Sequence, residues 1–504
     1  MRKNKGFAIG IFLITFLVLG SVCSSMIYIA SRDNYSSRQS NIKIETRILA
    51  NTASNYFFSK VVSDTQYIDT LIDCVSTPDI SVNCLSTDNK WAMINENGVQ
   101  VACPTTSNMK CFQIRLKVLN RSRNPMARDT VRVSLKTKIC PLNSQSITSP
   151  TFDKCRYTTY QQIFRKKQYY DYLYFADSIQ LDPSSGFFSL PGITPCPVST
   201  SSASARALSG SCYDVAFSNG DTITGPIRTN DDYFSFCGQP SISSTISVTV
   251  TGTGGSDGFH KDSNCAAPVG NLPSTKKESP IQLPNPRSYN QAVSDIQRNV
   301  ALGCNLTSQG ALNLVQQGTS TLLKDNSGSI LCTITGRGLI AAKGPIDLKG
   351  VTTGNLTIIV DGDINISGDL TYSNGSNSSN TNDLLTLYST GKITISKLNA
   401  SDTQSTREIS ALMLSTTRAI ETESWWIEDI NKKTGTLSLY GAIAGNYMPV
   451  FSSRDESTGN IIAGYSKLFT YDDRLKSMIS PYYALSPENV IWEKLNLSEV
   501  ASNK

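Results

Sequence analysis

Hydrophobic residues run without interruption at the start of the chain. Residues 6–30 are 25 positions without a single charge. A helix needs ~20 apolar residues to cross the hydrocarbon core of a bilayer, whereas the apolar core of a signal peptide has only ~7–15. No small-x-small cleavage pattern precedes the polar sequence that follows. We therefore predict a basic leader at 1–5 and a retained transmembrane helix at 6–31.

Beyond residue 31, apolar positions recur at three- and four-residue steps, as they do on one face of a helix. These positions are Leu49, Ala53, Tyr56, Phe57, Val61, Ile68, Leu71 and Ile72. Proline is absent from 32–75, so we expect the transmembrane helix to continue or restart as an amphipathic stalk over 32–75. Two explanations of its apolar stripe stay open. Either the exported body or a partner helix covers it, or it belongs to an ordinary helix packed on its own domain.

From Cys84 onward the apolar period changes to two, which is typical of strands. Residues 112–118 and 131–139 alternate apolar and polar side chains on either side of a turn-like segment with an Asn-Pro step. This pattern predicts a β-hairpin with one apolar face and one basic face. The candidate anionic-ligand face consists of Arg115, Lys117, Arg132, Lys136 and Lys138.

The hairpin belongs to a strongly basic module, which we place at 76–183. Thirteen Lys or Arg but only two Asp lie between Cys111 and Gln168. Aligned like charges destabilise a sheet, so a basic face has a functional interpretation, with anionic glycan, teichoic-type polymer or the DNA backbone as ligand. The alternative is a solvated sheet face balanced by acidic residues elsewhere. Within this module, 161–183 is expected to form an aromatic-rich pair of strands.

The rest of the chain is also predicted to be rich in strands. Asn-Gly and Gly-Pro turns indicate a loop-rich β module at 184–288, and 289–315 is expected to be a helical connector. Between 316 and 450, apolar pairs two residues apart repeat between Gly, Asp and Asn turns, which is typical of a β-solenoid, although their irregular spacing leaves a sandwich open. The clearest pairs are Ile346/Leu348, Leu356/Ile358/Val360, Ile364/Ile366, Leu370/Tyr372, Leu385/Leu387 and Ile393/Ile395.

The predicted fold is therefore mainly β with one long N-terminal α-helix that serves as transmembrane segment and stalk. A β-sandwich-like module is followed by a β-solenoid-like module, and 451–504 form a C-terminal segment.

Cysteine usage indicates the compartment. Cys23 lies inside the apolar run, and twelve further cysteines lie in polar, strand-like sequence: Cys74, Cys84, Cys103, Cys111, Cys140, Cys155, Cys196, Cys212, Cys237, Cys265, Cys304 and Cys332. This even set favours disulfides in an oxidising compartment, with reduced core thiols as the alternative. Basic residues flank the apolar run on both sides and do not decide its orientation. The cysteines favour a cytoplasmic N-terminus and a body outside the cell.

Candidate chemistry is sparse. His260 is the only histidine, and nucleotide-binding, CxxC and HExxH motifs are absent, so we predict no catalytic residues, no metal and no cofactor. Asp361 and Asp363 on the solenoid suggest glycan cleavage, but turn aspartates explain them better. The Asp472–Asp473 pair next to Arg474 indicates either a cation site or, more simply, an ion pair with the arginine.

The N-terminus resembles the prepilin-like proteins, which include the minor pilins of type IV pilus systems. Basic residues precede Gly6 and Phe7, and an apolar helix with a stalk follows. The resemblance implies that a prepilin peptidase cuts after Gly6 and that the helix packs in the membrane or a pilus with other pilins and assembly proteins. The fifth residue after Gly6 is Ile11, where major pilins have Glu; minor pilins near the tip often lack that Glu too.

The body resembles a set of large actinobacterial surface proteins that carry such an anchor. The resemblance lies in YYDYLYFADSIQLDP (169–183), GDTITGPIRTND (220–231), LYGAIAGNY (439–447), GYSKLFTYDDRLKSMISPYY (464–483) and IWEKL (491–495). It implies a non-enzymatic, membrane-anchored, minor-pilin-like envelope protein with a disulfide-linked extracellular β body. The alternatives are an adhesin or receptor that binds DNA or an anionic surface polymer through the basic face, and a polysaccharide-active enzyme on the solenoid.

Overall fold

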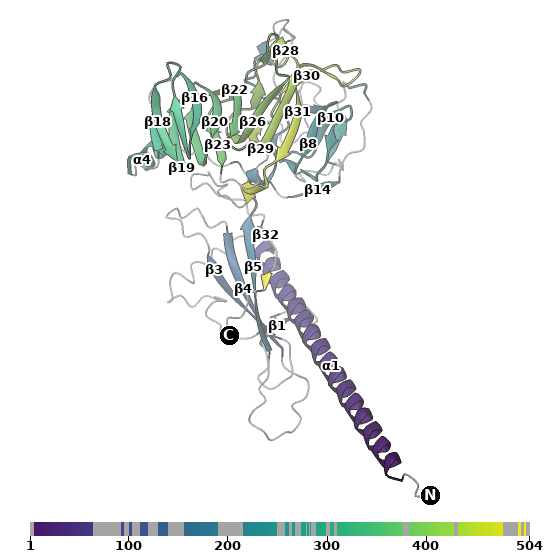
Figure 1. Cartoon of the computed structure of the whole chain (residues 1–504). Coiled ribbons are helices and arrows are strands. Elements are labelled where there is room, and N and C mark those ends of the chain that lie inside the picture. The colour runs from purple at the N-terminus through teal and green to yellow at the C-terminus, as the bar shows by residue number, and fades with distance from the viewer. Residues whose placement is uncertain are drawn as a thin grey trace. The chain divides into compact units, whose positions relative to one another are not determined.

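The fold is described from a computed structural model of the whole chain (Figure 1). It describes residues 5–63, 92–94, 100–102, 111–118, 130–139, 156–189, 215–248, 258–261, 265–267, 274–278, 280–281, 283, 289–298, 303–306, 310–375, 383–427, 432–476, 492–494 and 498–499. The chain divides into two compact units. One consists of Met1–Lys166 together with Trp492–Lys504, and the other of Lys167–Ile491.

The first unit is built on α1 (Lys5–Ser63), a continuous helix of 59 residues. The predicted long N-terminal helix is thus confirmed as far as Ser63, and 64–75 lie outside the described residues. The buried side chains in its second half recur at three- and four-residue steps, as expected for one helical face. They are Thr46, Ala50, Ala53, Ser54, Phe57 and Val61.

An antiparallel sheet forms the other layer of this unit. Its strands, in spatial order, are β2 (Gln100–Ala102), β1 (Ala92–Ile94), β3 (Cys111–Val118), β4 (Thr130–Ile139), β5 (Arg156–Lys166) and β32 (Trp492–Lys494), with β33 (Ser498–Glu499) also paired to β5. The predicted hairpin is β3–β4, with Ile114 opposite Leu135. Because β32 pairs with β5 and places Trp492 opposite Lys166, the second unit is inserted between two neighbouring strands.

The helix covers one face of this sheet. The Phe57 ring centroid lies 5.1 Å from that of Phe164. Farther along the helix, Thr46 Oγ1 lies 3.0 Å from the Tyr160 hydroxyl. A helix therefore provides the second layer, where the sequence suggested a sandwich-like pair of sheets. Alternating apolar positions mark a buried sheet face without specifying whether a helix or a second sheet covers it.

The second unit is a stack of parallel strands. One ladder runs through β15 (Gly303–Leu306), β19 (Arg337–Lys343), β21 (Asn355–Asp361), β23 (Leu384–Ser389), β26 (Thr406–Ser415), β29 (Gly435–Tyr447), β6 (Tyr174–Ser178), β9 (Ile227–Thr229), β12 (Ile246–Val248) and β14 (Thr275–Lys277). A second ladder begins with β16 (Gly310–Gln317), β20 (Ile346–Thr352), β22 (Ile364–Tyr372), β24 (Ile393–Ile395) and β27 (Ile420–Thr422). The ladders enclose one continuous buried core.

Further strands complete the stack. β31 (Ile461–Tyr471), β8 (Thr222–Thr224) and β11 (Ser241–Ile242) are joined in parallel, as are β7 (Ala216–Ser218), β10 (Phe234–Cys237) and β13 (Phe259–Lys261). Antiparallel additions are β17 (Ser320–Lys324), β18 (Ile330–Thr335) and β30 (Ser452–Arg454), together with the small pair β25 (Leu398–Asn399) and β28 (Lys432–Lys433).

The predicted rungs are present, and the register explains their irregular spacing. Arg337 pairs with Asn355 eighteen residues later, and Ile346 pairs with Ile364 at the same spacing. In the next rung the spacing is 29 residues, with Asn355 opposite Leu384. The eleven extra residues lie in a part of the chain that includes the Asn- and Ser-rich sequence 374–382, much of which is outside the described residues. Each apolar pair predicted to face the interior is buried.

The sequence-based boundaries differ from this organisation in two places. Among the described residues of 289–315, α4 (Tyr289–Arg298) is the helical part, and β15 and β16 follow it. Gly303 lies very close to β19: a Cβ atom added to it would be 1.6 Å from the Leu339 carbonyl oxygen. Glycine, which has no Cβ, is therefore needed at this position of the strand pair. The predicted strand pair in 161–183 is wrong, because β5 belongs to the sheet unit and β6 to the parallel stack.

Candidate functional site

The N-terminal half of α1 presents an apolar surface with no cover among the described residues. Ile14, Phe16, Leu17 and Ile27 are 65–71% exposed. From Ile14 to Val61 the helix is long and apolar enough, by length and composition, to cross a membrane. Gly6, which the resemblance assigns to processing, and Phe7 both lie within the helical backbone; their side chains are outside the described residues.

The serine side chains within this apolar segment are satisfied inside the helix. Ser21 Oγ donates to the Val18 carbonyl at 2.8 Å, and Ser24 Oγ donates to the Gly20 carbonyl at 2.8 Å. Hydroxyls bonded to the carbonyl three or four residues earlier need no water. The segment therefore suits a surrounding without hydrogen-bonding solvent.

The register of β3 and β4 brings the predicted basic positions to one face. Lys117 lies opposite Arg132, and Lys136 and Lys138 alternate with the apolar positions of β4. Arg115 lies two positions from Lys117 on β3 and therefore shares its face. The structure places the backbone of these five residues, while their side chains lie outside the described residues.

The helix covers the other face of that sheet. The β5 residues that contact α1 are Tyr160 and Phe164, which pair with Leu135 and Val131 of β4. Leu135 and Val131 alternate with the basic positions along the strand, so they belong to the opposite face of the sheet. The five basic positions therefore belong to the face opposite the one that packs on α1.

Two disulfides lie in the parallel stack. Cys237 is joined to Cys265, and Cys304 to Cys332, each across a sequence separation of 28. Cys23 is a free thiol, exposed on α1. The side chains of the other eight predicted disulfide cysteines lie outside the described residues.

Four of the five segments that resemble actinobacterial surface proteins lie in the second unit, and they meet in the middle of the parallel stack. They supply β6, β8 with β9, part of β29, and β31. Ile443 N donates to the Leu173 carbonyl at 2.8 Å, and the Tyr174 ring stacks on Phe469 with centroids 6.4 Å apart. β6, from the beginning of the second unit, and β31, from its end, thus lie in the same layer of the stack. The sequence order of these pieces gave no sign of this arrangement.

A buried ion pair joins two of these segments, β31 and the turn between β7 and β8. Lys467 Nζ on β31 lies 2.7 Å from Asp221 Oδ2 in the β7–β8 turn, and the two side chains are 2% and 0% exposed. Asp221 also accepts from the backbone amides of Lys467 at 3.0 Å and Ser218 at 2.9 Å. Its carboxylate is fully engaged, which assigns it a structural role.

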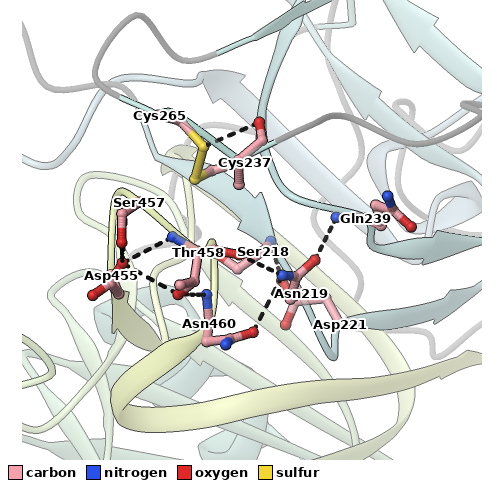
Figure 2. The surroundings of a disulfide bond; sticks show 11 residues. Ser218, Asn219, Asp221, Cys237, Gln239, Cys265, Asp455, Ser457, Thr458 and Asn460 are labelled. Carbon is pink, nitrogen blue, oxygen red and sulfur yellow. Dashed lines mark hydrogen bonds between the residues drawn. A yellow bond between two sulfur atoms is a disulfide. The ribbon is translucent and has the colours of Figure 1, made fainter.

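The β30–β31 turn adds a second fastening (Figure 2). Asp455 Oδ1 orders the turn by accepting from the backbone amides of Ser457 and Thr458, both at 2.8 Å. Asn219 then bridges two segments, because its Nδ2 donates to the Thr458 carbonyl at 2.7 Å and its Oδ1 accepts from Gln239 N at 2.6 Å. The Cys237–Cys265 disulfide lies beside this contact. It therefore restrains the chain near Gln239, which Asn219 contacts.

A charged cluster surrounds Glu278, next to β14. Its carboxylate accepts from Arg228 at 2.6 Å, from Lys167 at 2.8 Å and from the Tyr172 hydroxyl at 2.8 Å, and Lys276 lies within 2.6 Å. Burial raises the pKa of Glu278, but hydrogen bonds from Lys167, Lys276 and Tyr172 outweigh burial and lower the pKa to about 2. A carboxylate held ionised in this way does not act as a general base at neutral pH.

The candidate catalytic aspartates make turn contacts. Asp361 Oδ1 accepts from the Thr390 hydroxyl at 3.2 Å, and Asp363 Oδ1 accepts from Lys392 N at 2.8 Å. Asp472 forms a two-point ion pair with Arg474, as the simpler prediction expected, with contacts of 2.7 and 2.9 Å. Among the residues that the structure describes, no group of three or more His, Cys, Asp or Glu is arranged to hold a metal ion.

No family model and no curated protein matches the sequence. Among solved structures, the chain is similar to the competence-associated pilin ComZ from Thermus thermophilus. The identity is 11%, the alignment covers 91% of this chain and 97% of ComZ, and the TM-score is 0.30. A similarity at that score does not bear on the function of this chain.

Proposed function

We propose that this chain is a non-enzymatic, membrane-anchored, minor-pilin-like envelope protein of a type IV pilus or secretion system, with its body outside the cell. The observation that carries the proposal is the division of α1 into two parts. One end of a single helix is apolar and exposed, and the other end packs on an antiparallel sheet of the same chain.

Lipid or neighbouring helices suit the exposed part of α1. The apolar stretch of about 20 residues that spans a bilayer is contained in residues 6–30, which carry no charge. An exposed apolar surface of this size is unfavourable in water, so a hydrophobic partner is needed. The resemblance of the N-terminus names the partners: the membrane, other pilins and pilus assembly proteins.

The disulfides support a particular orientation. Basic residues on both sides of the apolar segment leave the orientation undecided. Disulfides persist in oxidising surroundings, and Cys237–Cys265 and Cys304–Cys332 both lie in the inserted body. We therefore assign the body to the outside and the N-terminus to the cytoplasm, as a single-pass topology.

N-terminal sequencing of the mature protein tests the prepilin assignment. We expect the mature chain to begin at Phe7. Gly6→Leu should block the cut, whereas the matched control Gly10→Leu, on the same helix, should leave it unchanged. An intact Met1 in the unmodified protein, or a cut beyond Ala30, would refute the assignment.

Thiol labelling of intact cells tests the topology separately. A membrane-impermeant maleimide should label the body only after reduction, at Cys237, Cys265, Cys304 and Cys332. Labelling of these thiols without reductant, and only after the cells are opened, would place the body in the cytosol and overturn the orientation.

A second candidate function is a receptor for DNA or an anionic surface polymer. The register supports it, because five basic positions share the sheet face opposite the one that packs on α1. Binding through such a face falls steeply with salt, since ligand binding releases counter-ions. Glu at positions 115, 117, 132 and 136 together should abolish retention on DNA or anionic-glycan columns. Unchanged retention by that variant would exclude this face.

A further inference from the structure

A groove of about 450 Å³ lies on the outer surface of the parallel stack, beside β16, β17, β20 and β22. Its polar lining includes Asn313, Lys324, Asp325, Asn326, Lys349 and Asp369. Such a volume lies within the usual range for small-molecule sites. In Figure 1, β16, β20 and β22 run side by side, in agreement with their parallel pairing.

The strand register builds the groove around two lysines. Asn313 on β16 pairs with Lys324 on β17 on one side and with Lys349 on β20 on the other. Residues directly opposite one another share a sheet face, so these three side chains lie in a row. Because neighbouring strands lie ~4.8 Å apart, the two lysine Cα atoms are separated by roughly 10 Å.

The acidic side chains of the groove are already engaged. Asp325 Oδ1 accepts from Ser327 Oγ at 2.7 Å and from Ser329 N at 2.8 Å within its own turn. Asp369 Oδ1 lies 3.3 Å from Arg407 Nη1 and accepts from Glu408 N at 3.1 Å. Asp369 is paired with Arg407, whereas the hydrogen bonds to Asp325 come from neutral groups and leave its negative charge in place.

Lys324 and Lys349 make no ion pair with any residue in the part of the chain that the structure describes. Two like charges that flank one strand destabilise the sheet, and the Asp325 carboxylate offsets only one of them. The carboxamides of Asn313 and Asn326 add neutral donors and acceptors beside the lysines. With Asp369 paired to Arg407, two lysines stand against the one carboxylate of Asp325, so the lining offers a net positive charge together with groups that hydrogen-bond to hydroxyls.

We propose that this groove binds an anionic saccharide, with Lys324 and Lys349 on its acidic group and the asparagines on its hydroxyls. The lining has no aromatic side chain on which a nucleic acid base could stack, and its two cations are too few to follow a phosphate backbone. A metal ion is disfavoured, because the lysines repel it and the described residues contain no group of three or more His, Cys, Asp or Glu that could hold one. The site is separate from the basic sheet face and does not depend on the pilin-like assignment.

The test uses the full chain in detergent micelles under oxidising conditions. Trigalacturonate and glucose 6-phosphate distinguish a carboxylate from a phosphate as the bound anion, and maltotriose is the neutral control. We expect at least one charged saccharide to bind and maltotriose not to bind. Lys324→Gln and Lys349→Gln should each weaken binding by about tenfold, since each removes one charge-assisted contact. Lys277→Gln, which removes an exposed lysine on β14, is the matched control and should leave binding unchanged.

Protection from amine modification gives a result that does not depend on any variant. Saturating charged saccharide should slow acetylation of Lys324 and Lys349 in the unmodified protein, and should not slow acetylation of Lys277. The proposal is overturned if neither charged saccharide binds, if the double Lys→Gln variant binds as well as the parent, or if acetylation of the two lysines is unaffected. Displacement of the saccharide by a lower concentration of single-stranded DNA would overturn the assigned ligand class.

Discussion

Neutralising Asp221 should destabilise the second unit locally, at the contact between β8 and β31. The Asp221 carboxylate lies 2.7 Å from Lys467 Nζ, and both side chains are buried. Asp221→Asn removes the negative charge and leaves a single oxygen, whereas the amides of Ser218 and Lys467 donate to different carboxylate oxygens. The variant therefore leaves the Lys467 ammonium buried without a counter-charge and turns an amide NH2 towards one of the two backbone amides.

The expected cost is large because burial makes an unpaired charge unfavourable. Removing one partner of a buried ion pair typically costs about 3–5 kcal/mol, whereas replacing both partners by groups of similar volume is often close to neutral. We therefore expect Asp221→Asn to destabilise the contact between β8 and β31 by about 3 kcal/mol. Adding Lys467→Met should restore most of that loss, because the charge is gone and the methionine fills the space of the lysine stem.

Hydrogen exchange of the full chain measures this opening locally. A loss of about 3 kcal/mol corresponds to roughly a hundredfold faster exchange in β8 and β31. β19 and β21, which lie elsewhere in the stack, are internal references and should be unchanged. The reasoning is refuted if exchange in β8 and β31 rises by less than about fivefold, if β19 responds equally, or if Lys467→Met brings no recovery.

Three further outcomes follow from the contacts described above. Replacing Cys237 and Cys265 by Ser should cost about 3–4 kcal/mol for a separation of 28 residues, seen as a lower urea midpoint for exchange in β10, and an unchanged midpoint would argue against the disulfide. Phe57→Ala should cost about 3–5 kcal/mol and expose β5 to protease, whereas Phe16→Ala should have no such effect. Because the pKa of Glu278 is about 2 when folded and 4.5 ordinarily, its contribution to stability is fully present above about pH 4.5 and is lost as the pH falls towards 2. Glu278→Gln should flatten this acid limb, and an unaltered pH profile would contradict that role.

The elements that could be predicted are those whose signal is local in sequence. The uncharged run at 6–30 and the three- and four-residue steps up to Val61 specify one helix, and α1 follows them. Ile364 and Ile366 specify a buried rung in the same way, because alternation alone separates the inside of a strand from its outside. None of these signals needs more than the 25 neighbouring residues of the uncharged run.

The unpredicted features depend on pairing between distant segments. Nothing in the sequence near Tyr174 indicates that β6 lies beside β29, since a parallel strand specifies its faces and not its neighbour. The groove has the same origin, because Lys324 and Lys349 lie on one face only through their common partner Asn313. Lys349 lies 36 residues after its partner Asn313, a spacing that no local pattern in the sequence marks.

The shared layer explains how a body of this size fits between two strands of a sheet. The chain leaves β5 at Lys166 and returns at Trp492, which are paired with each other, so the two ends of the insertion must start from neighbouring points. A parallel stack built in one direction would instead place its first and last strands at opposite ends. Here the Tyr471 hydroxyl donates to the Tyr170 carbonyl at 2.9 Å, so the two ends of the second unit meet.

The stack extends from this layer in both directions. β9, β12 and β14 continue it on one side, and β29 and the strands before it continue it on the other. Closure in the middle of the stack thus gives the insertion two adjacent ends, and little loop-closure entropy opposes its place in the sheet.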